Sequence, residues 1–159
     1  MKIILSSNSP RRKELLAGLG VDFEVRVLKG VDERYPDDIP LNEVPLYIAI
    51  EKASAYTVAK DELVVTADTV VIVDNEILGK PKDRAEAYGM LRKISGKTHQ
   101  VVTGVCLTTI DDQRSFTVTT DVEFKELSDN EIYYYIDKYR PFDKAGAYGI
   151  QEWIGYVGV

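Results

Sequence analysis

The sequence predicts an α/β fold: a mixed twisted sheet that is flanked by helices and includes one long antiparallel hairpin. β-rich apolar runs alternate with segments of helical periodicity through residues 3–94. Two long strand patterns, 99–110 and 115–127, then follow one another across the acidic turn Asp111-Asp112-Gln113. Because such a hairpin is antiparallel, the sheet is expected to be mixed rather than purely parallel.

The composition fits one globular domain. With 159 residues, of which 45% are hydrophobic and 29% charged, the chain can bury a substantial core. The net charge of −6 argues against a general binder of nucleic-acid polymers, which would carry a basic surface. No segment approaches the ~20 apolar residues that span a bilayer, so we expect a cytoplasmic protein without a membrane partner.

Cysteine and histidine chemistry is limited, because Cys106 and His99 are the only residues of their kinds. A single cysteine excludes an intrachain disulfide and a cysteine-rich zinc site. The two residues lie an odd number of positions apart on one predicted strand, and therefore on opposite faces. A Cys/His nucleophile pair is not expected, and Cys106 is predicted to be a core residue.

At the N-terminus, a short strand at 3–5 leads through the polar segment 6–9 into a helix. Ser9 suits the N-cap of this helix, and Pro10 suits its first helical position. The helix is expected to bury one apolar face, which is formed by Leu15, Leu16 and Leu19.

Two arginines occupy the first turn of this helix, where the positive end of the helix dipole disfavours each cation by roughly 0.3–1 kcal/mol. A bound polyanion would offset that cost. The helix N–H groups, the hydroxyls of Ser7 and Ser9 and the guanidinium groups of Arg11 and Arg12 would then form a phosphate site. The alternative is a capped helix with two solvated arginines, and the segment by itself favours neither interpretation.

The alternation of strand and helix patterns continues after the first helix. Residues 21–27 predict a strand, and the acidic, proline-containing stretch 30–40 predicts a loop. A helix is expected over 41–60, with Pro45 near its start. Its apolar face is predicted to consist of Leu46, Ile50 and Ala53.

Two β-rich runs, 63–65 and 70–73, come next, and Asp74-Asn75 predicts a hairpin turn into a further strand at 76–78. Asp68 lies between the two runs, where a buried and unpaired carboxylate would be costly. Asp68 is therefore either a turn residue that caps the end of a strand or a carboxylate kept for chemistry.

The later helices have clear boundaries in the sequence. A helix is expected over 83–94, with Asp83 as its N-cap and Ser95-Gly96 as its end. The segment 128–131 is a capping box, which predicts a third helix through about residue 138.

The C-terminal part of the chain mixes packing and loop signals. The tyrosine run Tyr133-Tyr134-Tyr135 lies between isoleucines, which favours packing over a base-stacking platform. Residues 141–149 are too rich in glycine and charge for a helix. The apolar segment 153–159 is predicted to be a strand.

Three further places could carry binding chemistry. Lys52 lies on the apolar-rich face of its helix, so its charge either points into a cleft or snorkels to water. Lys80 stands in a cationic loop, which could equally be a helix approach with solvated lysines. The segment 143–151 combines Lys144 with small residues that permit close backbone approach, and the amide of Gln151 could read a base edge.

Several motifs together carry a family resemblance. They are Ser7-x-Ser9-Pro10-Arg11-Arg12, Glu33, Lys52-Ala53, Ala67-Asp68-Thr69-Val70-Val71, Gly79-Lys80-Pro81, Ser95-Gly96-x-x-His99, Thr103-Gly104 and Asp143-Lys144-Ala145-Gly146-Ala147-Tyr148-Gly149-Ile150-Gln151. In this order and spacing they resemble the motifs of the Maf-like (septum-formation) nucleoside triphosphate pyrophosphatases, over residues 3–154. The resemblance implies a fold like that of Maf proteins and inosine triphosphatases.

The resemblance also implies an activity, the hydrolysis of a nucleoside triphosphate between its α and β phosphates with a divalent metal. The products are a monophosphate and pyrophosphate. Within the family, the chain is similar to the dTTP/UTP branch, because Arg11, Thr69 and Gln151 match the positions associated with that preference. Asp68 matches the family's proton acceptor.

A triphosphate needs cations, a metal and a positioned water, and the chain offers groups for each. The expected cations are Arg11, Arg12, Lys52, Lys80 and Lys144. Because hard cations prefer oxygen ligands, Mg²⁺ or Mn²⁺ would be held by phosphate oxygens with Asp68 and Glu33. Asp68 would accept the proton of the attacking water, and Lys80 would stabilise the charge of the transition state.

Two other functions remain open at this point. One is a house-cleaning pyrophosphatase that acts on the purine nucleotides inosine or xanthosine triphosphate. The other is a non-catalytic, nucleotide-binding regulator of cell division. The presence of both Asp68 and Lys80 favours the enzyme over the regulator.

The resemblance also bears on domain organisation. The family pattern continues past Gly155 with a Gly-Ser-Tyr segment, a Gly-Leu-Pro turn and a final helix. We therefore expect residues 1–159 to form a single Maf-like domain that lacks the family's C-terminal strand and helix. A homodimer is the assembly that the resemblance implies.

Overall fold

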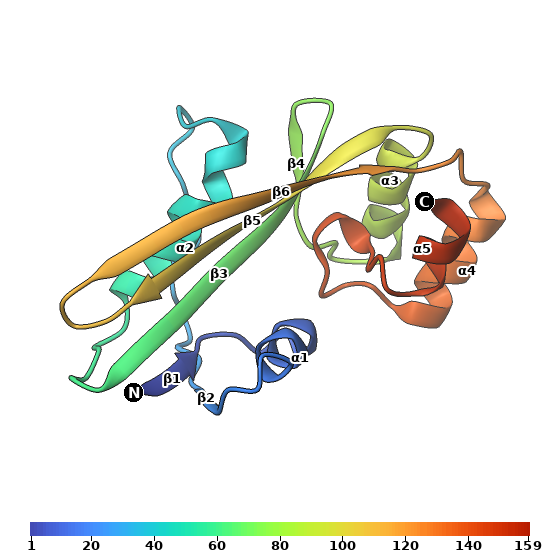
Figure 1. Cartoon of the computed structure of the whole chain (residues 1–159). Coiled ribbons are helices and arrows are strands. Elements are labelled where there is room, and N and C mark those ends of the chain that lie inside the picture. Colours follow the sequence, from blue (N-terminus) through green and yellow to red (C-terminus); the bar gives the residue numbers. More distant parts are fainter. The chain divides into compact units, whose positions relative to one another are not determined.

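The computed structural model describes residues 1–159 and contains a six-stranded sheet in the order β2-β1-β3-β5-β6, with β4 paired to β3 (Figure 1). The strands are β1 (Lys2–Leu5), β2 (Phe23–Val25), β3 (Glu62–Val73), β4 (Glu76–Leu78), β5 (Thr98–Thr108) and β6 (Gln113–Glu123). The helices are α1 (Pro10–Ala17), α2 (Val44–Ser54), α3 (Arg84–Ile94), α4 (Asp129–Tyr139) and α5 (Trp153–Gly158), with 3₁₀ turns η1 (Leu41–Glu43) and η2 (Ala145–Ala147). Strand β1 runs parallel to β2 and β3, whereas β4 is antiparallel to β3. The predicted mixed sheet with flanking helices is confirmed.

The chain divides into two compact units, and the division falls within the three long strands β3, β5 and β6. Unit 1 comprises Met1–Asp68 and Thr103–Val118, and unit 2 comprises Thr69–Val102 and Thr119–Val159. Helices α1 and α2 belong to unit 1, and α3, α4 and α5 belong to unit 2. None of the helices has the length and apolar character that a membrane crossing requires.

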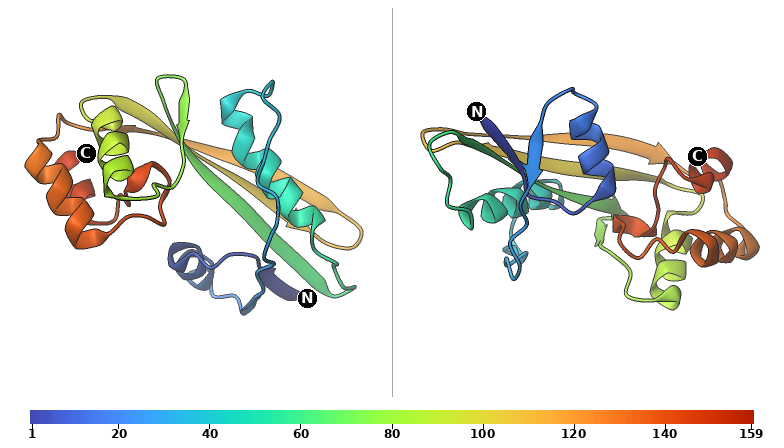
Figure 2. Two further views of the ribbon diagram at one scale, coloured as in Figure 1. Left: turned by 180° about the vertical axis from the view of Figure 1, so that it is seen from behind. Right: turned by 90° about the horizontal axis from the view of Figure 1, so that it is seen from below.

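In unit 1, α2 packs very closely on β5. A Cβ atom at Gly104 of β5 would lie 2.4 Å from the backbone nitrogen of Leu46 in α2, so only glycine permits this approach. Next to this contact, Ala49 and Ala53 of α2 pack with Cys106, which is fully buried as predicted. The helix backbone therefore rests directly on the strand (Figure 2).

In unit 2, the helices α3, α4 and α5 gather around one apolar core (Figure 2). Its fully buried members include Leu91 and Ile94 of α3, Ile132, Tyr135 and Ile136 of α4, and Ile154 of α5. On the outside of the α3–α4 contact, the rings of Tyr88 and Tyr133 stack at 4.8 Å. The tyrosine run therefore serves packing, as predicted.

The predicted local signals at helix and turn boundaries are confirmed. Ser9 caps α1, because its hydroxyl accepts a hydrogen bond from the backbone N–H of Arg12 at 3.3 Å. Asp83 caps α3 in the same way, and Ser128 forms a complete capping box at the start of α4. Asp74 and Asn75 have positive φ angles of 49° and 60°, which suit the tight turn between β3 and β4.

The predicted buried face of α1 is wrong. Leu15 is 56% exposed and Leu19 is 74% exposed, and no residue of α1 is buried. The contacts that hold this helix lie at its start instead, where Ser9 caps it and the side chain of Arg12 reaches the carbonyl oxygen of Ala67. Polar contacts at one end of the helix thus replace the expected apolar seam.

Three other predictions need correction. The segment 153–159 is the helix α5 rather than a strand, since Ile154 and Gly158 are buried one helical turn apart. A short apolar run does not distinguish these two states. Helix α2 ends at Ser54, and its buried face is shifted from the predicted one to Val44, Ile48, Ala49 and Ala53. The two runs around Asp68 form one continuous strand, β3, so Asp68 is not a turn residue.

Candidate functional site

Four predicted site residues of unit 1 meet at one point. The carbonyl oxygen of Ala67 accepts a hydrogen bond from Arg12 Nη1 at 3.2 Å and another from Lys52 Nζ at 3.1 Å. Lys52 Nζ also lies 3.4 Å from Asp68 Oδ1 and 3.1 Å from Glu33 Oε1. The Lys52 side chain is only 17% exposed, so its charge points into this cluster and does not snorkel to water.

Different elements deliver the four side chains to this cluster. Strand β3 carries Asp68, which is mostly shielded because the strand continues on both sides of it. Arg12 comes from the first turn of α1 and Lys52 from the last turn of α2. Glu33 comes from the loop between β2 and η1 and is 60% exposed, which makes it the most accessible member.

Burial sets the electrostatics of this cluster. Removal from water raises the pKa of Asp68 above its ordinary value, and this effect outweighs the opposing attraction of Lys52. Burial also lowers the pKa of Arg12, although Asp68 and Glu33 oppose the change. A carboxyl group with a raised pKa holds a proton more strongly, which suits a general base that must take a proton from water.

The remaining predicted residues of unit 1 lie around the start of α1. The Ser7 hydroxyl is buried and accepts a hydrogen bond from the backbone N–H of Ser9 at 3.1 Å. Ser9 accepts in turn from the backbone of Arg12, so each serine keeps its own O–H to donate. Arg11 is half exposed, and its guanidinium lies 3.9 Å from Glu14 on the same helix.

In unit 2, a backbone hydrogen bond brings two predicted site segments together. The N–H of Gly146 donates to the carbonyl oxygen of Gly79 at 3.1 Å, next to Lys80. Gly146 has a φ of 70°, and a Cβ there would lie 2.7 Å from a methyl group of Val71. Glycine is therefore required at this junction. Lys80 itself is exposed, and Thr69 is half-buried in β3.

The last two predicted residues, Lys144 and Gln151, flank a tight loop in unit 2. Lys144 Nζ lies 3.1 Å from Asp143 Oδ1 and 3.9 Å from Glu152 Oε1. Gln151 is exposed and occupies a turn that closes when the N–H of Glu152 donates to the carbonyl oxygen of Gly149 at 3.0 Å.

Sequence reasoning missed three groups, two of them in unit 2 and one in unit 1. The hydroxyl of Tyr135 accepts a hydrogen bond from the N–H of Gly149 at 2.9 Å and donates one to Glu152 Oε1 at 2.6 Å. The carbonyl oxygen of Ala67, the shared acceptor of unit 1, was also missed. The only sequence signal for Glu152 is its position directly after the motif that ends at Gln151.

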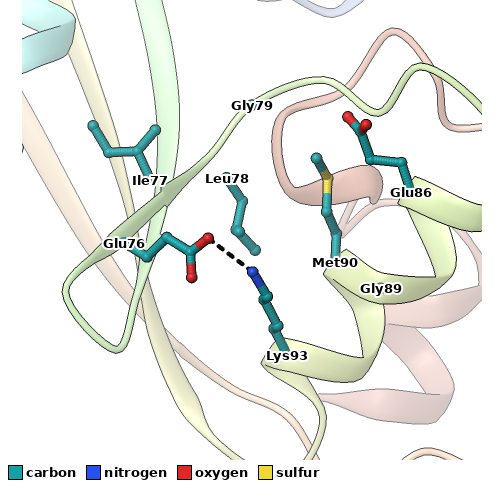
Figure 3. A pocket seen from close by; sticks show the side chains of 8 residues that line it. All are labelled: Glu76, Ile77, Leu78, Gly79, Glu86, Gly89, Met90 and Lys93. Atoms are coloured by element: carbon teal, nitrogen blue, oxygen red, sulfur yellow. Dashed lines mark hydrogen bonds and ion pairs between the residues drawn. The ribbon is translucent and has the colours of Figure 1, made fainter.

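Unit 2 also has a surface groove of about 320 Å³ between β4 and α3 (Figure 3). An ion pair crosses it, with Lys93 Nζ at 2.8 Å from Glu76 Oε1, and Met90 and Leu78 supply an apolar wall. None of the predicted site residues lines this groove. Its one cation, Lys93, is already paired with Glu76, so the candidate site rests on the clusters described above.

Comparison with known proteins identifies the family of this chain. The family model described as Maf-like protein matches residues 2–159. A dTTP/UTP pyrophosphatase of Phocaeicola vulgatus is 62% identical over 99% of this chain and 83% of its own length, and one of Bacteroides thetaiotaomicron is 61% identical over the same shares. The solved Ham1 protein of Staphylococcus aureus matches 78% of this chain and 72% of its own with a TM-score of 0.51 and 15% identity, a likeness of fold alone. The chain therefore belongs to the Maf-like protein family.

Proposed function

We propose that this chain hydrolyses nucleoside triphosphates, dTTP and UTP above all, to the monophosphate and pyrophosphate. The observation that carries the proposal is the cluster of Arg12, Lys52 and Asp68, in which two cations donate to one carbonyl oxygen and a shielded carboxylate pairs with one of them. Cations beside a base are what water attack on a polyphosphate requires. Relatives that are 50–62% identical and bear the name dTTP/UTP pyrophosphatase support the substrate class.

In this proposal, Asp68 accepts the proton of a water molecule while the water oxygen bonds to phosphorus and the α–β phosphoanhydride breaks. The raised pKa of Asp68 brings its proton affinity closer to neutral pH, which favours this transfer. Arg12, Lys52, Lys80 and Lys144 neutralise the charge that develops on the departing pyrophosphate. Ser7 and Ser9 donate their O–H groups to phosphate oxygens.

A divalent metal fits the unit 1 cluster on the chemistry of its donors. Glu33 Oε1 and Asp68 Oδ1 both contact the ammonium of Lys52, so two carboxylate oxygens already converge on one positive charge. The chain brings no group of three or more His, Cys, Asp or Glu side chains together. Substrate oxygens and water would supply the other ligands of Mg²⁺ or Mn²⁺. When bound, the metal would make water more acidic and neutralise phosphate charge.

Base selection is the role that we propose for Arg11, Thr69 and Gln151. The two other candidate functions, a purine pyrophosphatase and a non-catalytic regulator, gain no specific support from the site or from the names of the relatives. A cytoplasmic location belongs to the same proposal, because nucleoside triphosphates are cytoplasmic metabolites.

A nucleotide panel tests this function. Pyrophosphate release should be measured with dTTP, UTP, CTP, ITP and XTP in Mg²⁺ and in Mn²⁺, with phosphorus NMR to identify the broken bond. We expect dTTP and UTP to be the best substrates, with no release of single phosphate. Faster turnover of ITP would support the purine enzyme instead, and binding of dTTP without turnover in either metal would support the regulator.

A further inference from the structure

A single buried hydroxyl, that of Tyr135, holds the turn that carries Gln151. Gly149 and Glu152 are the first and last residues of this turn, and both bind the hydroxyl of Tyr135. Tyr135 lies on α4 and is fully buried, whereas Ile150 and Gln151, the two central residues, are exposed. We call the hydroxyl of Tyr135 and its two partners the tyrosine clamp.

The clamp uses the full capacity of its hydroxyl. A phenol has one proton to donate, and Tyr135 gives it to Glu152 at 2.6 Å while its oxygen accepts from Gly149 at 2.9 Å. Burial raises the pKa of Tyr135 above its ordinary value, and the hydrogen bond to Glu152 adds to this effect. The proton therefore stays on the hydroxyl, and both hydrogen bonds persist across the working range.

A second contact, between Gly155 and Ile150, also fixes the turn. A Cβ at Gly155 would lie 1.7 Å from the carbonyl oxygen of Ile150, so the turn lies directly against the backbone of α5. Glu152 is the N-cap residue of α5, yet its side chain makes no capping hydrogen bond. It is directed to Tyr135 instead.

From this geometry we propose that Tyr135 and Glu152 are positioning residues for base recognition, because the tyrosine clamp fixes the backbone from which the Gln151 amide projects. The proposal rests on the proposed function, in which Gln151 contacts the base. An amide discriminates between bases only when its donor and acceptor are held in a fixed orientation. Neither Tyr135 nor Glu152 needs to touch the nucleotide.

The variants of Glu152 separate its hydrogen bond from its charge. Glu152→Gln keeps an oxygen that can accept from Tyr135 but removes the charge 3.9 Å from Lys144, whereas Glu152→Ala removes both. Tyr135→Phe removes the hydroxyl alone. Tyr134→Phe is the matched control on the same helix, because the Tyr134 hydroxyl bonds only the exposed Lys138.

The readout is the ratio of kcat/KM for UTP to that for CTP. We expect Tyr135→Phe and Glu152→Ala to lower this ratio about two- to tenfold, the worth of one net hydrogen bond. Glu152→Gln and Tyr134→Phe should keep the wild-type ratio. A Tyr135→Phe change added to Gln151→Ala should lower the ratio no further, because both act through the same amide. An unchanged ratio in Tyr135→Phe, or a further fall in the double variant, would overturn the proposal.

Amide hydrogen exchange supplies a readout that needs no activity. The N–H of Gly149 should exchange faster in Tyr135→Phe than in the wild type, and its rate should be normal in Tyr134→Phe. An unchanged rate would refute the clamp even in an active enzyme. If the wild type released no pyrophosphate from UTP, the proposed function would fail, and exchange at Gly149 would still decide whether the clamp exists. Should Tyr135→Phe fail to fold, the two Glu152 variants carry the same test at a side chain that is partly exposed.

Discussion

The two clusters of predicted site residues are held by different forces. In unit 1, Arg12, Lys52 and Asp68 are charged and mostly shielded: Arg12 and Lys52 both donate to the carbonyl oxygen of Ala67, and Asp68 pairs with Lys52. In unit 2, the turn at Gln151 is held by a neutral hydroxyl and by a glycine contact. The charged groups of unit 1 include a carboxylate that can accept a proton, whereas the hydroxyl of Tyr135 fixes the position of a backbone turn. The difference suggests that changes in unit 1 alter turnover and changes at the turn alter substrate choice.

The largest expected effect is at Asp68. Asp68→Asn removes the proton acceptor with almost no change of shape, so kcat for dTTP should fall by about 10²–10⁴-fold, the usual contribution of a general base. Pyrophosphate release at saturating dTTP is the measurement. The UTP to CTP ratio should be retained in whatever activity remains, and near-wild-type turnover would remove Asp68 from the mechanism.

The same substitution should make the protein more stable at neutral pH. The folded pKa of Asp68 is raised by burial, so the folded state binds its proton more tightly than the unfolded state does. The corresponding stability is present below the ordinary pKa of an aspartate and is lost as pH rises through the folded value. Urea unfolding should therefore show that Asp68→Asn exceeds the wild type in free energy of unfolding by an amount that grows from pH 3.5 to pH 7. The growth should be about 1 kcal/mol for each unit by which the pKa is raised. An advantage that shrinks with rising pH would contradict the burial effect.

A smaller effect is expected at Gly155. A methyl group there would overlap the carbonyl oxygen of Ile150, so Gly155→Ala should displace the turn and lower the free energy of unfolding by about 1–3 kcal/mol, as overpacking does. The ratio of kcat/KM for UTP to that for CTP should also fall, while kcat for UTP changes little. Gly89→Ala is the control, because a Cβ at Gly89 meets no atom within 4 Å.

His99 should give a modest dependence of stability on pH. Its ring is buried against Phe124 and Tyr148, its Nε2 bonds the Tyr148 hydroxyl, and its Nδ1 has no hydrogen-bond partner. Burial lowers the folded pKa of His99, so its stabilising contribution is complete above the unfolded value of about 6.5 and is lost as pH falls below it. Wild-type protein should lose more stability between pH 7 and pH 5 than His99→Gln does.

The smallest structural effect is expected at Arg11, which tests whether unit 1 takes part in substrate choice. Its side chain is half exposed, so Arg11→Ala should change the free energy of unfolding by less than about 0.5 kcal/mol. Arg11 belongs to unit 1, yet its proposed role is base selection. A clear change in the preference between dTTP and UTP would show that unit 1 also selects the substrate, whereas an unchanged preference would leave selection to unit 2.

Local signals in the sequence predicted much of the fold because they act over a few residues. The caps at Ser9, Asp83 and Ser128 and the turn at Asp74-Asn75 depend only on their neighbours, and all are confirmed. The exposed leucines of α1 and the helix at 153–158 were mispredicted, because the partner of an apolar face is a matter of tertiary structure.

The site residues were likewise predicted where local motifs mark them and missed where only tertiary contacts do. The motifs identified the charged residues one by one, and the structure shows that Glu33, Lys52 and Asp68 meet although they come from three separate segments. Tyr135 could not be found in this way. It lies in an amphipathic helix, where an aromatic residue predicts core packing, and only the fold reveals that its hydroxyl reaches Gly149 and Glu152.

The close contact at Gly104 lets a residue without a side chain control the position of the helix that carries Lys52. Helix α2 is seated on β5 at Leu46, and the same rigid helix carries Lys52 less than two turns farther along, about 9 Å at 1.5 Å per residue. Any side chain at position 104 would lift the helix and draw the ammonium of Lys52 away from Ala67 and Asp68. Position 104 thus sets the distance between α2 and β5. Substitutions of increasing size there would weaken the ion pair of Lys52 and Asp68 without altering either residue.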